Sequence, residues 1–543
     1  MFVKEKFIGR EEIVKLISKR LCDLKEGYRQ NIALLGDELL GKTHIIKYIF
    51  ESNYDPDIIP LYFDLSQPAT QVFPQRFLNT ILFSFLKTKE ITLPRENFSR
   101  LIEESQHLIP TTTSKIQEIS AALNKGRLDT TTFREMLQLP EMLHQETQQK
   151  IVIILDEFQN LESLKIRNAF QELGKTIMTQ KSTMYIVTSS HKAKAKKIVQ
   201  DELSLLFGNF ETIDVQHFDN KTSSILIKNR LKNTIMPQET ANFLINFTGG
   251  HPFYLDKITE HIYQSAILLE SNTITPFVFI YSLEGILFND WGVLNLRFNK
   301  YIDVLASKNK TDIIQMLLLI AQGKNRLKDL SSILHKSYQD INQKLSKLID
   351  TGILWRSGSF FNINDRVFGF WLKFVYLEKL NNLSQNYEDQ VISFRKKIEQ
   401  SLFEFIETSK KDIAQRLYEL FTSFSNESVK IGQNKITLSK FKEIESLNLN
   451  GFYIKNVFLC HCDQGEWLIA FKNGDITEES VCEFIDKTGP FQTKDKQARR
   501  LIIGIDKTEV NARLLAQEAK IATWNIDHLN MLLDLYGKPR LIV

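Results

Sequence analysis

The sequence predicts an α/β fold in which a parallel sheet carries a phosphate-binding loop, followed by a helical lid, a winged helix, a helical linker and a small α/β C-terminal domain. Three observations predict it. A G-x-x-x-x-G-K-T motif from Gly36 to Thr43 follows a short apolar run and precedes a helical pattern. A second apolar run, residues 151–155, ends in Asp156 and Glu157. At 543 residues the chain is too long for one hydrophobic core.

The composition is that of a folded, water-soluble protein, with 43% hydrophobic and 25% charged residues. Its 69 basic and 65 acidic residues give a net charge of +4, so overall charge predicts neither nucleic-acid nor membrane binding. Charged residues occupy the N-terminus where a secretory signal would be apolar, and no apolar run reaches membrane-spanning length. The four cysteines do not suggest a disulfide framework. We therefore expect a cytoplasmic protein with no membrane partner.

The glycine-rich motif has the surroundings that phosphate binding requires. Residues 31–35 read as a buried strand, and residues 44–50 have apolar side chains at helical spacing. Glycines let backbone amides approach phosphates closely, and the helix N-terminus adds partial positive charge. We expect Lys42 to reach the terminal phosphates of ATP and the Thr43 hydroxyl to ligate Mg²⁺.

The second motif supplies the acidic residues of the same site. Asp156 is expected to hold Mg²⁺ through water, and Glu157 to act as general base toward the attacking water. An extra strand at residues 58–65, between the motifs, indicates the additional-strand branch of phosphate-binding-loop proteins. Another apolar strand, residues 184–188, leads to Ser189 and Ser190. Either a serine there senses the γ-phosphate, or Ser190 caps the next helix.

With these motifs, the chain resembles the archaeal-type P-loop ATPases of the STAND and AAA+ region, relatives of the origin-recognition ATPases. Three further segments carry the resemblance: residues 7–12 (FIGREE), 156–159 (DEFQ) and 248–254 (TGGHPFY). It implies that Gly9 and Arg10 border the nucleotide and that the turn before Pro252 lies in a helical lid over the base. The residues then expected to bind ATP are Gly9, Arg10, Gly36, Asp37, Glu38, Leu39, Leu40, Gly41, Lys42, Thr43, His44, Ser189 and Pro252, with Lys42 and Glu157 catalytic and Thr43 and Asp156 at the metal.

One position departs from that family. Its members commonly carry an arginine in a segment similar to residues 206–210 (LFGNF), where this chain has Asn209. A neutral side chain cannot stabilise charge on a transferred phosphoryl group, so we expect slow turnover unless another cation substitutes. The candidates are a cluster of lysines that otherwise reads as a solvated helix face: Lys192, Lys194, Lys196 and Lys197.

Residues 327–363 read as helix, turn, helix and hairpin, the pattern of a winged helix. Two interpretations are open: the second helix contacts DNA, or the domain is a structural relay packed on the motor. A DNA-reading helix would present polar and basic side chains to the major groove: Gln339, Asn342, Gln343, Lys344 and Lys347.

The tail resembles the restriction-endonuclease-like domain that ends many archaeal-type ATPases. Strands are expected at residues 457–462, 466–472, 501–505 and 521–524, with helices at 478–486, 510–518 and 529–535. An active nuclease of this type needs paired carboxylates for Mg²⁺. Ala470 stands where the second strand needs glutamate and Asn456 where the first needs an acid, so Lys472 alone is left. We expect an inactive domain.

The predicted domains are an ATPase core (1–218), a helical lid (219–300), a winged helix (301–365), a helical linker (366–450) and the C-terminal domain (451–543). The predicted function is a slowly hydrolysing, Mg²⁺-dependent ATPase switch of the AAA+/STAND type. A DNA-binding initiator or regulator ATPase is the alternative, and an ATP-dependent nuclease the third. The expected partners are ATP and ADP, with DNA, another protein or a second copy of the chain as further candidates.

Overall fold

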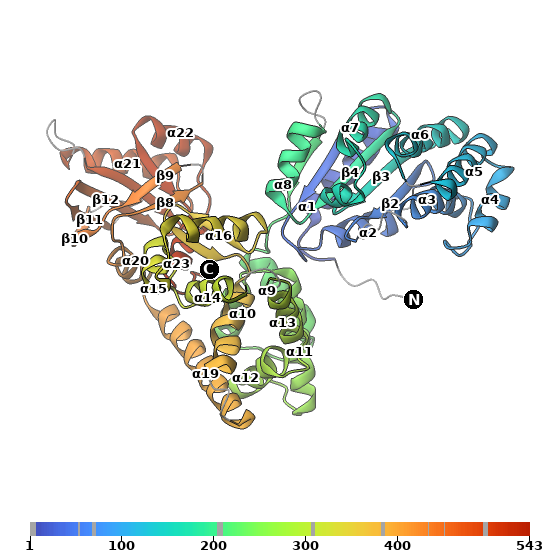
Figure 1. Cartoon of the computed structure of the whole chain (residues 1–543). Helices are drawn as coiled ribbons and strands as arrows, with labels where there is room; N and C mark the ends of the chain where they lie inside the picture. Colours follow the sequence, from blue (N-terminus) through green and yellow to red (C-terminus); the bar gives the residue numbers. More distant parts are fainter. Residues whose placement is uncertain are drawn as a thin grey trace. The chain divides into compact units, whose positions relative to one another are not determined.

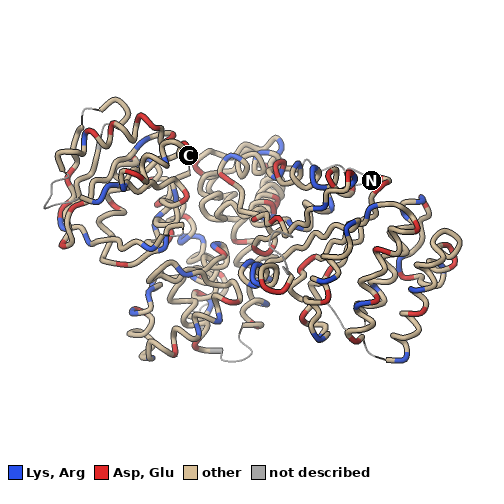
Figure 2. The backbone as a smooth tube through the Cα atoms, turned by 90° about the horizontal axis from the view of Figure 1, so that it is seen from above, with Lys and Arg blue, Asp and Glu red and all other residues tan. Residues whose placement is uncertain are grey.

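The computed structural model describes residues 7–52, 55–67, 72–126, 128–203, 210–305, 310–381, 386–432, 434–449, 451–454, 456–491 and 498–542. The chain divides into two compact units, which Figure 1 shows in sequence colours. The first unit comprises Met1–Ile225 and His251–Phe253, and the second Leu226–Gly250 and Tyr254–Val543. In both, Lys and Arg are interspersed with Asp and Glu along the backbone (Figure 2).

The first unit is built on a parallel five-stranded sheet in the order β2-β3-β4-β1-β5. The predicted apolar runs form its strands, as an α/β fold requires. The strand predicted at residues 58–65, between the two motifs in the chain, is present as β2 at the edge of the sheet, and β4 lies between the strands of the two motifs. Crossover connections free the spatial order of parallel strands from their chain order. The strands are β1 (Asn31–Leu35), β2 (Ile58–Asp64), β3 (Lys150–Asp156), β4 (Thr183–Ser189) and β5 (Phe210–Asp214).

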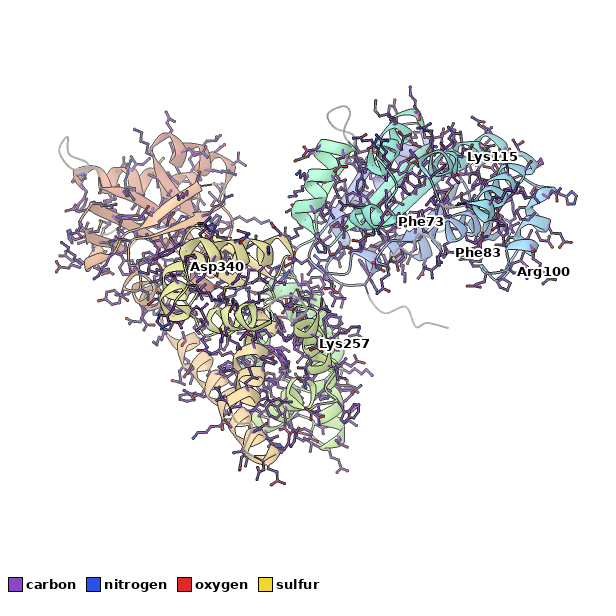
Figure 3. The ribbon with its side chains drawn as sticks, viewed as in Figure 1. Phe73, Phe83, Arg100, Lys115, Lys257 and Asp340 are labelled. Carbon is purple, nitrogen blue, oxygen red and sulfur yellow. The ribbon has the colours of Figure 1, made fainter. Side chains whose placement is uncertain are left out.

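Both faces of this sheet are covered by apolar side chains, which explains why its central strands are continuously hydrophobic. Because side chains alternate along a strand, Ile153 packs into the core on one face and Ile154 into the core on the other. Figure 1 shows α3 to α6 gathered beside the β2 edge, and Figure 3 labels Phe73 of this group. The helices of this unit are α1 (Glu11–Lys25), α2 (Lys42–Ser52), α3 (Phe73–Thr88), α4 (Phe98–Gln106), α5 (Pro110–Lys125), α6 (Thr130–Thr147), the 3₁₀ helix η1 (Phe158–Leu164), α7 (Ala169–Thr179), α8 (Lys192–Lys197) and the π-helical turn η2 (Ile198–Glu202).

The second unit begins with helices, as predicted for the lid. One apolar stretch within them, Pro276–Leu305, is long enough to cross a membrane, although 56% of its most apolar window is buried inside the protein. Residues 289–292 interrupt its helical structure. The elements here are α9 (Asn220–Leu231), which starts before the boundary, α10 (Gln238–Thr248), α11 (Pro252–Leu268), α12 (Pro276–Leu283), the π-helical turn η3 (Glu284–Phe288), α13 (Val293–Leu305) and α14 (Lys310–Ala321).

A helix–hairpin module follows, with its elements in the order that the sequence predicts. Ser337 caps the second helix by accepting a hydrogen bond from the backbone amide of Asp340. Gly358, at φ 58°, makes the tight turn of the hairpin. The module consists of α15 (Leu327–Leu334), α16 (Tyr338–Asp350), β6 (Leu354–Ser357) and β7 (Phe360–Ile363).

The predicted helical linker, residues 366–450, ends in three strands that the sequence analysis did not assign. The first two, β8 and β9, form a hairpin around Gly432, which has a φ of 60°. The third, β10, is an edge strand with a mostly polar surface, so it lacks the hydrophobic alternation that would have revealed it. The elements are α17 (Arg366–Trp371), the π-helical turn η4 (Leu372–Tyr376), α18 (Leu377–Asn381), α19 (Tyr387–Lys410), α20 (Ile413–Phe421), β8 (Glu427–Ile431), β9 (Asn434–Leu438) and β10 (Phe441–Asn448).

The C-terminal sheet has the order β10-β11-β12-β13-β14, antiparallel from β10 to β12 and parallel from β12 to β14. Its two faces carry separate cores, one containing Trp467 and the other Leu468, since neighbouring residues of β12 point to opposite faces. The predicted strands and helices of the tail are present: β11 (Asn456–Cys462), β12 (Gly465–Lys472), α21 (Glu478–Thr488), the 3₁₀ turn η5 (Gly489–Phe491), β13 (Arg499–Gly504), α22 (Val510–Glu518), β14 (Ile521–Trp524) and α23 (Ile526–Leu535).

A polar cluster within the second unit joins the end of α10 to residues far along the chain. The Arg366 guanidinium donates to the backbone carbonyl of Asn246 over 2.9 Å and forms an ion pair with Asp534. Arg540 pairs with the same carboxylate at 2.6 Å, and its backbone amide donates to the Asn246 side chain over 3.1 Å. Asp534 is thus shared by two arginines, which stabilise its charge in a largely buried place.

Candidate nucleotide site and the C-terminal sheet

The loop between β1 and α2 has a backbone that only certain residues can adopt. Gly41 has a φ of 88°, a left-handed conformation that glycine takes without strain. A Cβ atom on Gly36 would lie 2.9 Å from both the Cβ atom and the carbonyl oxygen of Val215, so glycine is needed for close packing there. The two glycines of the motif therefore serve different purposes. Gly41 allows the left-handed turn, and Gly36 leaves room for Val215, the residue that follows β5.

Lys42 lies inside this loop, with its side chain only 5% exposed. Its Nζ donates to the carbonyl oxygens of Gly36 over 3.0 Å and Asp37 over 2.8 Å, and it lies 3.9 Å from Oε1 of Glu157. Burial lowers the pKa of the ammonium group, and the Glu157 carboxylate opposes the shift. The loop thus surrounds one cation, positioned by backbone carbonyls.

The carboxylate of Asp156 collects hydroxyl groups from three different segments. Thr43 and Tyr62 each donate to Oδ2 over 2.6 Å, and Thr188 donates to Oδ1. Burial, followed by the bond to Asp156, raises the pKa of the Tyr62 phenol, so this hydroxyl keeps its proton. Thr43 and Asp156, the predicted metal pair, are therefore adjacent, whereas Tyr62 and Thr188 were not predicted.

The oxygen donors of Thr43 and Asp156 are of the hard type that Mg²⁺ prefers. Across the described ranges, no group of three or more His, Cys, Asp or Glu residues could hold a metal ion. Mg²⁺ commonly binds through one or two protein oxygens, with substrate phosphates and water as its other ligands. The pair fits a magnesium ion that arrives with a phosphate-bearing ligand.

Glu157 is held in a strained backbone conformation by its neighbours. Its φ is 55°, a left-handed value uncommon for a residue with a side chain. One carboxylate oxygen, Oε2, accepts hydrogen bonds from the Ser190 amide at 3.0 Å, the Ser190 hydroxyl at 2.7 Å and the Gln159 side chain at 2.7 Å. The other oxygen faces Lys42. Glu157, the candidate base, thus lies beside the loop, and the hydrogen bonds from Ser190 and Gln159 hold it by one carboxylate oxygen.

Ser189 ends β4 and Ser190 follows it, and the structure contradicts one of the two interpretations of these serines, the helix cap. Ser189 is buried, and its hydroxyl accepts from the backbone amide of His191 over 3.0 Å. Ser190 contacts Glu157 and does not cap α8, which has no side-chain cap. Serine is a common helix cap, but here the carboxylate of Glu157 competes successfully for its hydroxyl. Gln159, whose side chain donates to Glu157, was not predicted as a site residue, and neither was the contact between Ser190 and Glu157.

Arg10 reaches the loop from the N-terminal segment. Its guanidinium donates to the Gln216 carbonyl over 2.6 Å, approaches the Leu40 carbonyl at 3.5 Å and lies 4.6 Å from the centre of the Phe218 ring. Burial lowers its pKa to about 10. Gly9 is required beside it, because a Cβ atom there would lie 2.2 Å from the Thr222 side chain.

Two histidines border the loop from other directions. His251 Nε2 lies 3.2 Å from the carbonyl oxygen of Glu38, and Pro252 immediately begins α11. His44, on the exposed side of α2, stacks on Phe7 with ring centres 5.6 Å apart. Arg10 and His251, the residue before Pro252, therefore both approach carbonyl groups of the loop.

Asn209 lies outside the described residues. Among the lysines proposed to replace an arginine, Lys192 Nζ lies 3.8 Å from Asp37 Oδ2, beside the loop. Lys194 pairs with Glu162 and Lys196 with Asp214, away from it. Among the described ion pairs of this cluster, the one made by Lys192 is the one that reaches a residue of the loop.

The helix–hairpin module neutralises one of its predicted DNA contacts. Lys344 pairs with Asp312 at 2.6 Å and with Asp340 at 3.0 Å, and Lys336 pairs with Asp312 as well. These carboxylates compete with any phosphate for the ammonium group. Lys347 is exposed on the same helix.

Lys472, the residue expected to remain from a nuclease site, ends β12 of the C-terminal sheet. Ala470 pairs with Val457 on the neighbouring strand, and Lys472 donates to the Thr477 hydroxyl over 3.3 Å and stacks on Tyr453. Glu466 is six residues away along β12, about 20 Å at the rise of an extended strand. Among the described residues, no group of three or more His, Cys, Asp or Glu side chains that could hold a metal ion lies there.

We therefore expect the full chain to cut neither single-stranded nor double-stranded DNA or RNA with Mg²⁺ or Mn²⁺. The assay follows end-labelled substrates on denaturing gels, with and without ATP, beside a Lys472→Ala variant. Cleavage that depends on the metal and disappears in this variant would contradict an inactive domain.

No model of a protein family matches the chain, and neither does any curated protein. Among solved structures, a Walker-type ATPase of Pyrococcus abyssi aligns with 68% of this chain and 97% of its own, at 16% identity and a TM-score of 0.48. The ORC2 protein of Aeropyrum pernix, in ADPNP–ADP complexes, aligns over 73% and 97%, at 11% identity and a TM-score of 0.43. The RuvB Holliday junction branch migration motor of Thermotoga maritima aligns with 68% of this chain and 96% of its own, at 13% identity and a TM-score of 0.33. Likeness at this level leaves the function to be derived from the site.

Proposed function

We propose that the protein binds ATP with Mg²⁺, hydrolyses it slowly and uses the nucleotide state to switch its second unit, as an ATPase of the AAA+/STAND type. The observation that carries the proposal is the junction at Asp156. The Asp156 carboxylate accepts a hydrogen bond from the Thr43 hydroxyl over 2.6 Å. Thr43 follows the buried Lys42 in the chain, and Glu157 follows Asp156. A cation, a hard-oxygen pair and a candidate base thus converge at the end of one parallel sheet.

Each of these groups has a separate task in hydrolysis. Lys42 supplies positive charge for the terminal phosphates, and Thr43 and Asp156 supply oxygen atoms for the metal. Magnesium, when bound, neutralises phosphate charge. Glu157 accepts the proton of the attacking water. Tyr62 and Thr188 hold the Asp156 carboxylate in one orientation, because each donates a hydrogen bond to it.

Slow turnover follows from the tether on Glu157. Three hydrogen bonds from Ser190 and Gln159 engage Oε2, so only Oε1, which faces Lys42, is left to accept a proton from the attacking water. Lys192 is the cation that we assign to the place of a missing arginine, on its proximity to Asp37. A single lysine lacks the planar fork of an arginine and stabilises the transferred phosphoryl group less well.

Coupling to the second unit begins at the loop itself. Glu38 contacts His251, and the chain then enters α11 at Pro252 and continues into the second unit. A change in the loop backbone on nucleotide binding therefore moves His251 and the first turn of α11. This link supports the switch part of the proposal.

A Mg²⁺ titration of nucleotide binding tests the proposal. The full chain is expected to bind a fluorescent ATP analogue in a Mg²⁺-dependent manner and to release phosphate. Tyr62→Phe is expected to raise the Mg²⁺ concentration for half-maximal binding by about 10-fold, the lower end of losses when a group orienting a metal ligand is removed.

Tyr48→Phe is the matched control, since Tyr48 lies on α2 and stacks on Phe7 without a described bond to Asp156. It is expected to titrate like the unchanged protein. Nucleotide binding that ignores Mg²⁺, or equal behaviour of the two variants, would contradict the assignment of the metal pair.

A further inference from the structure

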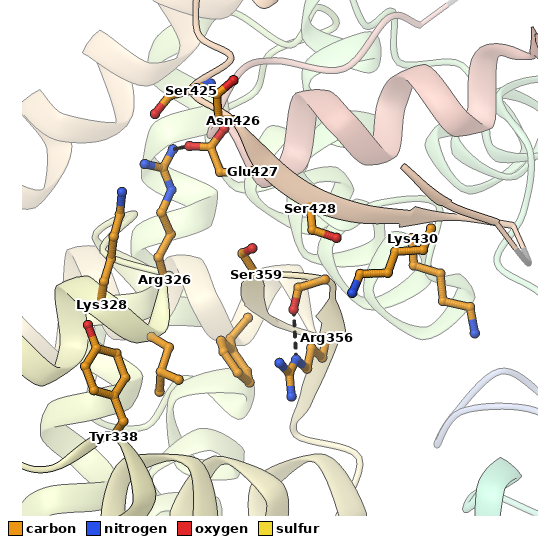
Figure 4. A pocket seen from close by; sticks show the side chains of 14 residues that line it. Arg326, Lys328, Tyr338, Arg356, Ser359, Ser425, Asn426, Glu427, Ser428 and Lys430 are labelled. Atoms are coloured by element: carbon orange, nitrogen blue, oxygen red, sulfur yellow. Dashed lines mark hydrogen bonds and ion pairs between the residues drawn. The ribbon is translucent and has the colours of Figure 1, made fainter. Parts of the chain in front are cut away.

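A cavity of about 610 Å³ opens within the second unit, where the helix–hairpin module meets the β8–β9 hairpin (Figure 4). Four segments form its walls: the start of α15, the start of α16, the β6–β7 hairpin, and residues 425–435. None of the nucleotide-site residues lines it. Its volume lies in the range of ligand-binding cavities.

The cavity concentrates positive charge in a chain whose overall charge is nearly balanced. Five cationic side chains line it, together with a single carboxylate, Glu427. Glu427 is buried and pairs with Arg326 at 2.7 Å. Within the described ranges, no ion pair engages the other four cations. The cations are Arg326, Lys328, Arg356, Lys430 and Lys435.

The walls of the cavity are held together by backbone contacts. The Ser359 amide donates to the Ser428 carbonyl over 2.8 Å, and the Lys430 amide donates to the Ser357 hydroxyl over 2.9 Å. A Cβ atom on Gly358 would lie 1.9 Å from the Ser428 carbonyl oxygen, so the turn of the β6–β7 hairpin packs directly on β8. The turn is therefore covered and not free to enter a DNA groove, and the charged walls have a fixed spacing.

Two arrangements prepare the cavity for an extended anion. Arg356 lies 5.1 Å from the centre of the Phe361 ring and donates to the Gly358 carbonyl over 2.9 Å, which orients its guanidinium. Tyr338 is 56% exposed at the rim, and Figure 4 shows its ring on the same side as Lys328. An exposed aromatic ring beside basic side chains is a common way to stack a nucleobase next to its phosphate.

We propose that this cavity binds the phosphodiester backbone of single-stranded nucleic acid, with a base stacked on Tyr338. The cations come from three segments, and Figure 4 shows Arg326, Lys328 and Lys430 spread across the cavity, so they suit successive phosphates better than one phosphate group. The surface differs from the DNA-reading face predicted for α16, where Lys344 is already paired. The inference goes beyond the proposed ATPase function and does not depend on it.

The test is fluorescence anisotropy with the full chain and no added nucleotide. The probe is a labelled oligothymidylate of about 20 nucleotides, longer than the site of a small single-strand-binding fold. At about 50 mM salt, the double variant Lys430→Glu/Lys435→Glu is expected to bind at least about 10-fold more weakly than the unchanged chain. The slope of log affinity against log salt is expected to become shallower by about 0.7 for each phosphate that the variant no longer neutralises.

Lys396→Glu is the matched control, because Lys396 is exposed on α19 of the same unit and does not line the cavity. It is expected to bind within about 2-fold of the unchanged chain, because a lysine outside the site neutralises no phosphate. Lys328→Glu, on the opposite wall, provides a second variant should the double variant fail to fold by circular dichroism.

Four outcomes overturn the proposal. The first is that the chain does not bind the oligonucleotide at low salt, and the second is that the control and the cavity variants weaken binding equally. The third is that a duplex of the same sequence binds more tightly, and the fourth is that the chain binds inorganic polyphosphate but not the oligonucleotide. The last outcome would keep an anion site but exclude a nucleic acid as its ligand.

Discussion

Replacing Lys42 with alanine is expected to abolish ATP hydrolysis and to weaken ATP binding by about 10- to 100-fold. Lys42 is the buried cation that the loop surrounds, and a hydrogen bond to a charged group is worth about 1.5–3 kcal/mol. Isothermal titration with ATP and Mg²⁺ gives the affinity, and a coupled phosphate assay gives the turnover.

Lys47→Ala is the control for this change, because Lys47 lies on the same helix with its side chain exposed. Its affinity and turnover are expected to match those of the unchanged protein. If Lys42→Ala binds and hydrolyses ATP normally while remaining folded, the loop is not the site of phosphate binding.

Glu157→Gln is expected to bind ATP as well as the unchanged protein but to hydrolyse it about 100- to 10,000-fold more slowly, the usual contribution of a general base. The amide has the shape of the carboxylate, and its oxygen still accepts the hydrogen bonds from Ser190. Only the capacity to take a proton is removed. Single-turnover hydrolysis of pre-bound ATP measures the chemical step without the contribution of product release.

Glu162→Gln serves as the comparison, since Glu162 lies in η1, the 3₁₀ helix that begins directly after Glu157, and pairs with Lys194 away from the loop. Two results would count against Glu157 as the base: unchanged hydrolysis by Glu157→Gln, or loss of ATP binding in a folded variant.

The elements nearest the chemistry were predictable because their signals are local. The loop, the apolar strand before Asp156 and the helix after Lys42 each follow from consecutive residues, and the structure has them where expected. Tyr62 was not predicted because it comes from an edge strand almost a hundred residues before Asp156, and nothing near it in the sequence marks a phenol that points toward that carboxylate. Spatial neighbours across a parallel sheet depend on strand order, which chain order does not determine.

The errors in the rest of the chain have physical causes too. The β8–β9 hairpin carries alternating apolar residues around Gly432, but each of its strands has only five residues, a short signal compared with that of the 24-residue helix α19 before it. Strand β10 is polar on most of its surface and owes its structure to pairing with β11. Its assignment required knowledge of the sheet that it joins, since β-structure is stabilised by cross-strand contacts more than by local preference.

The cluster around Asp534 has a consequence for how the protein is made. The backbone amide of Arg540 contacts the side chain of Asn246, 294 residues earlier in the chain. At about 5–20 residues per second, a ribosome needs roughly 15 to 60 s to synthesise that interval. During this time Asn246, near the end of α10, lacks its contact with Arg540. Nearly all of the first unit has already been translated by then. Cellular factors that bind nascent chains therefore have a long interval in which to protect the incomplete second unit.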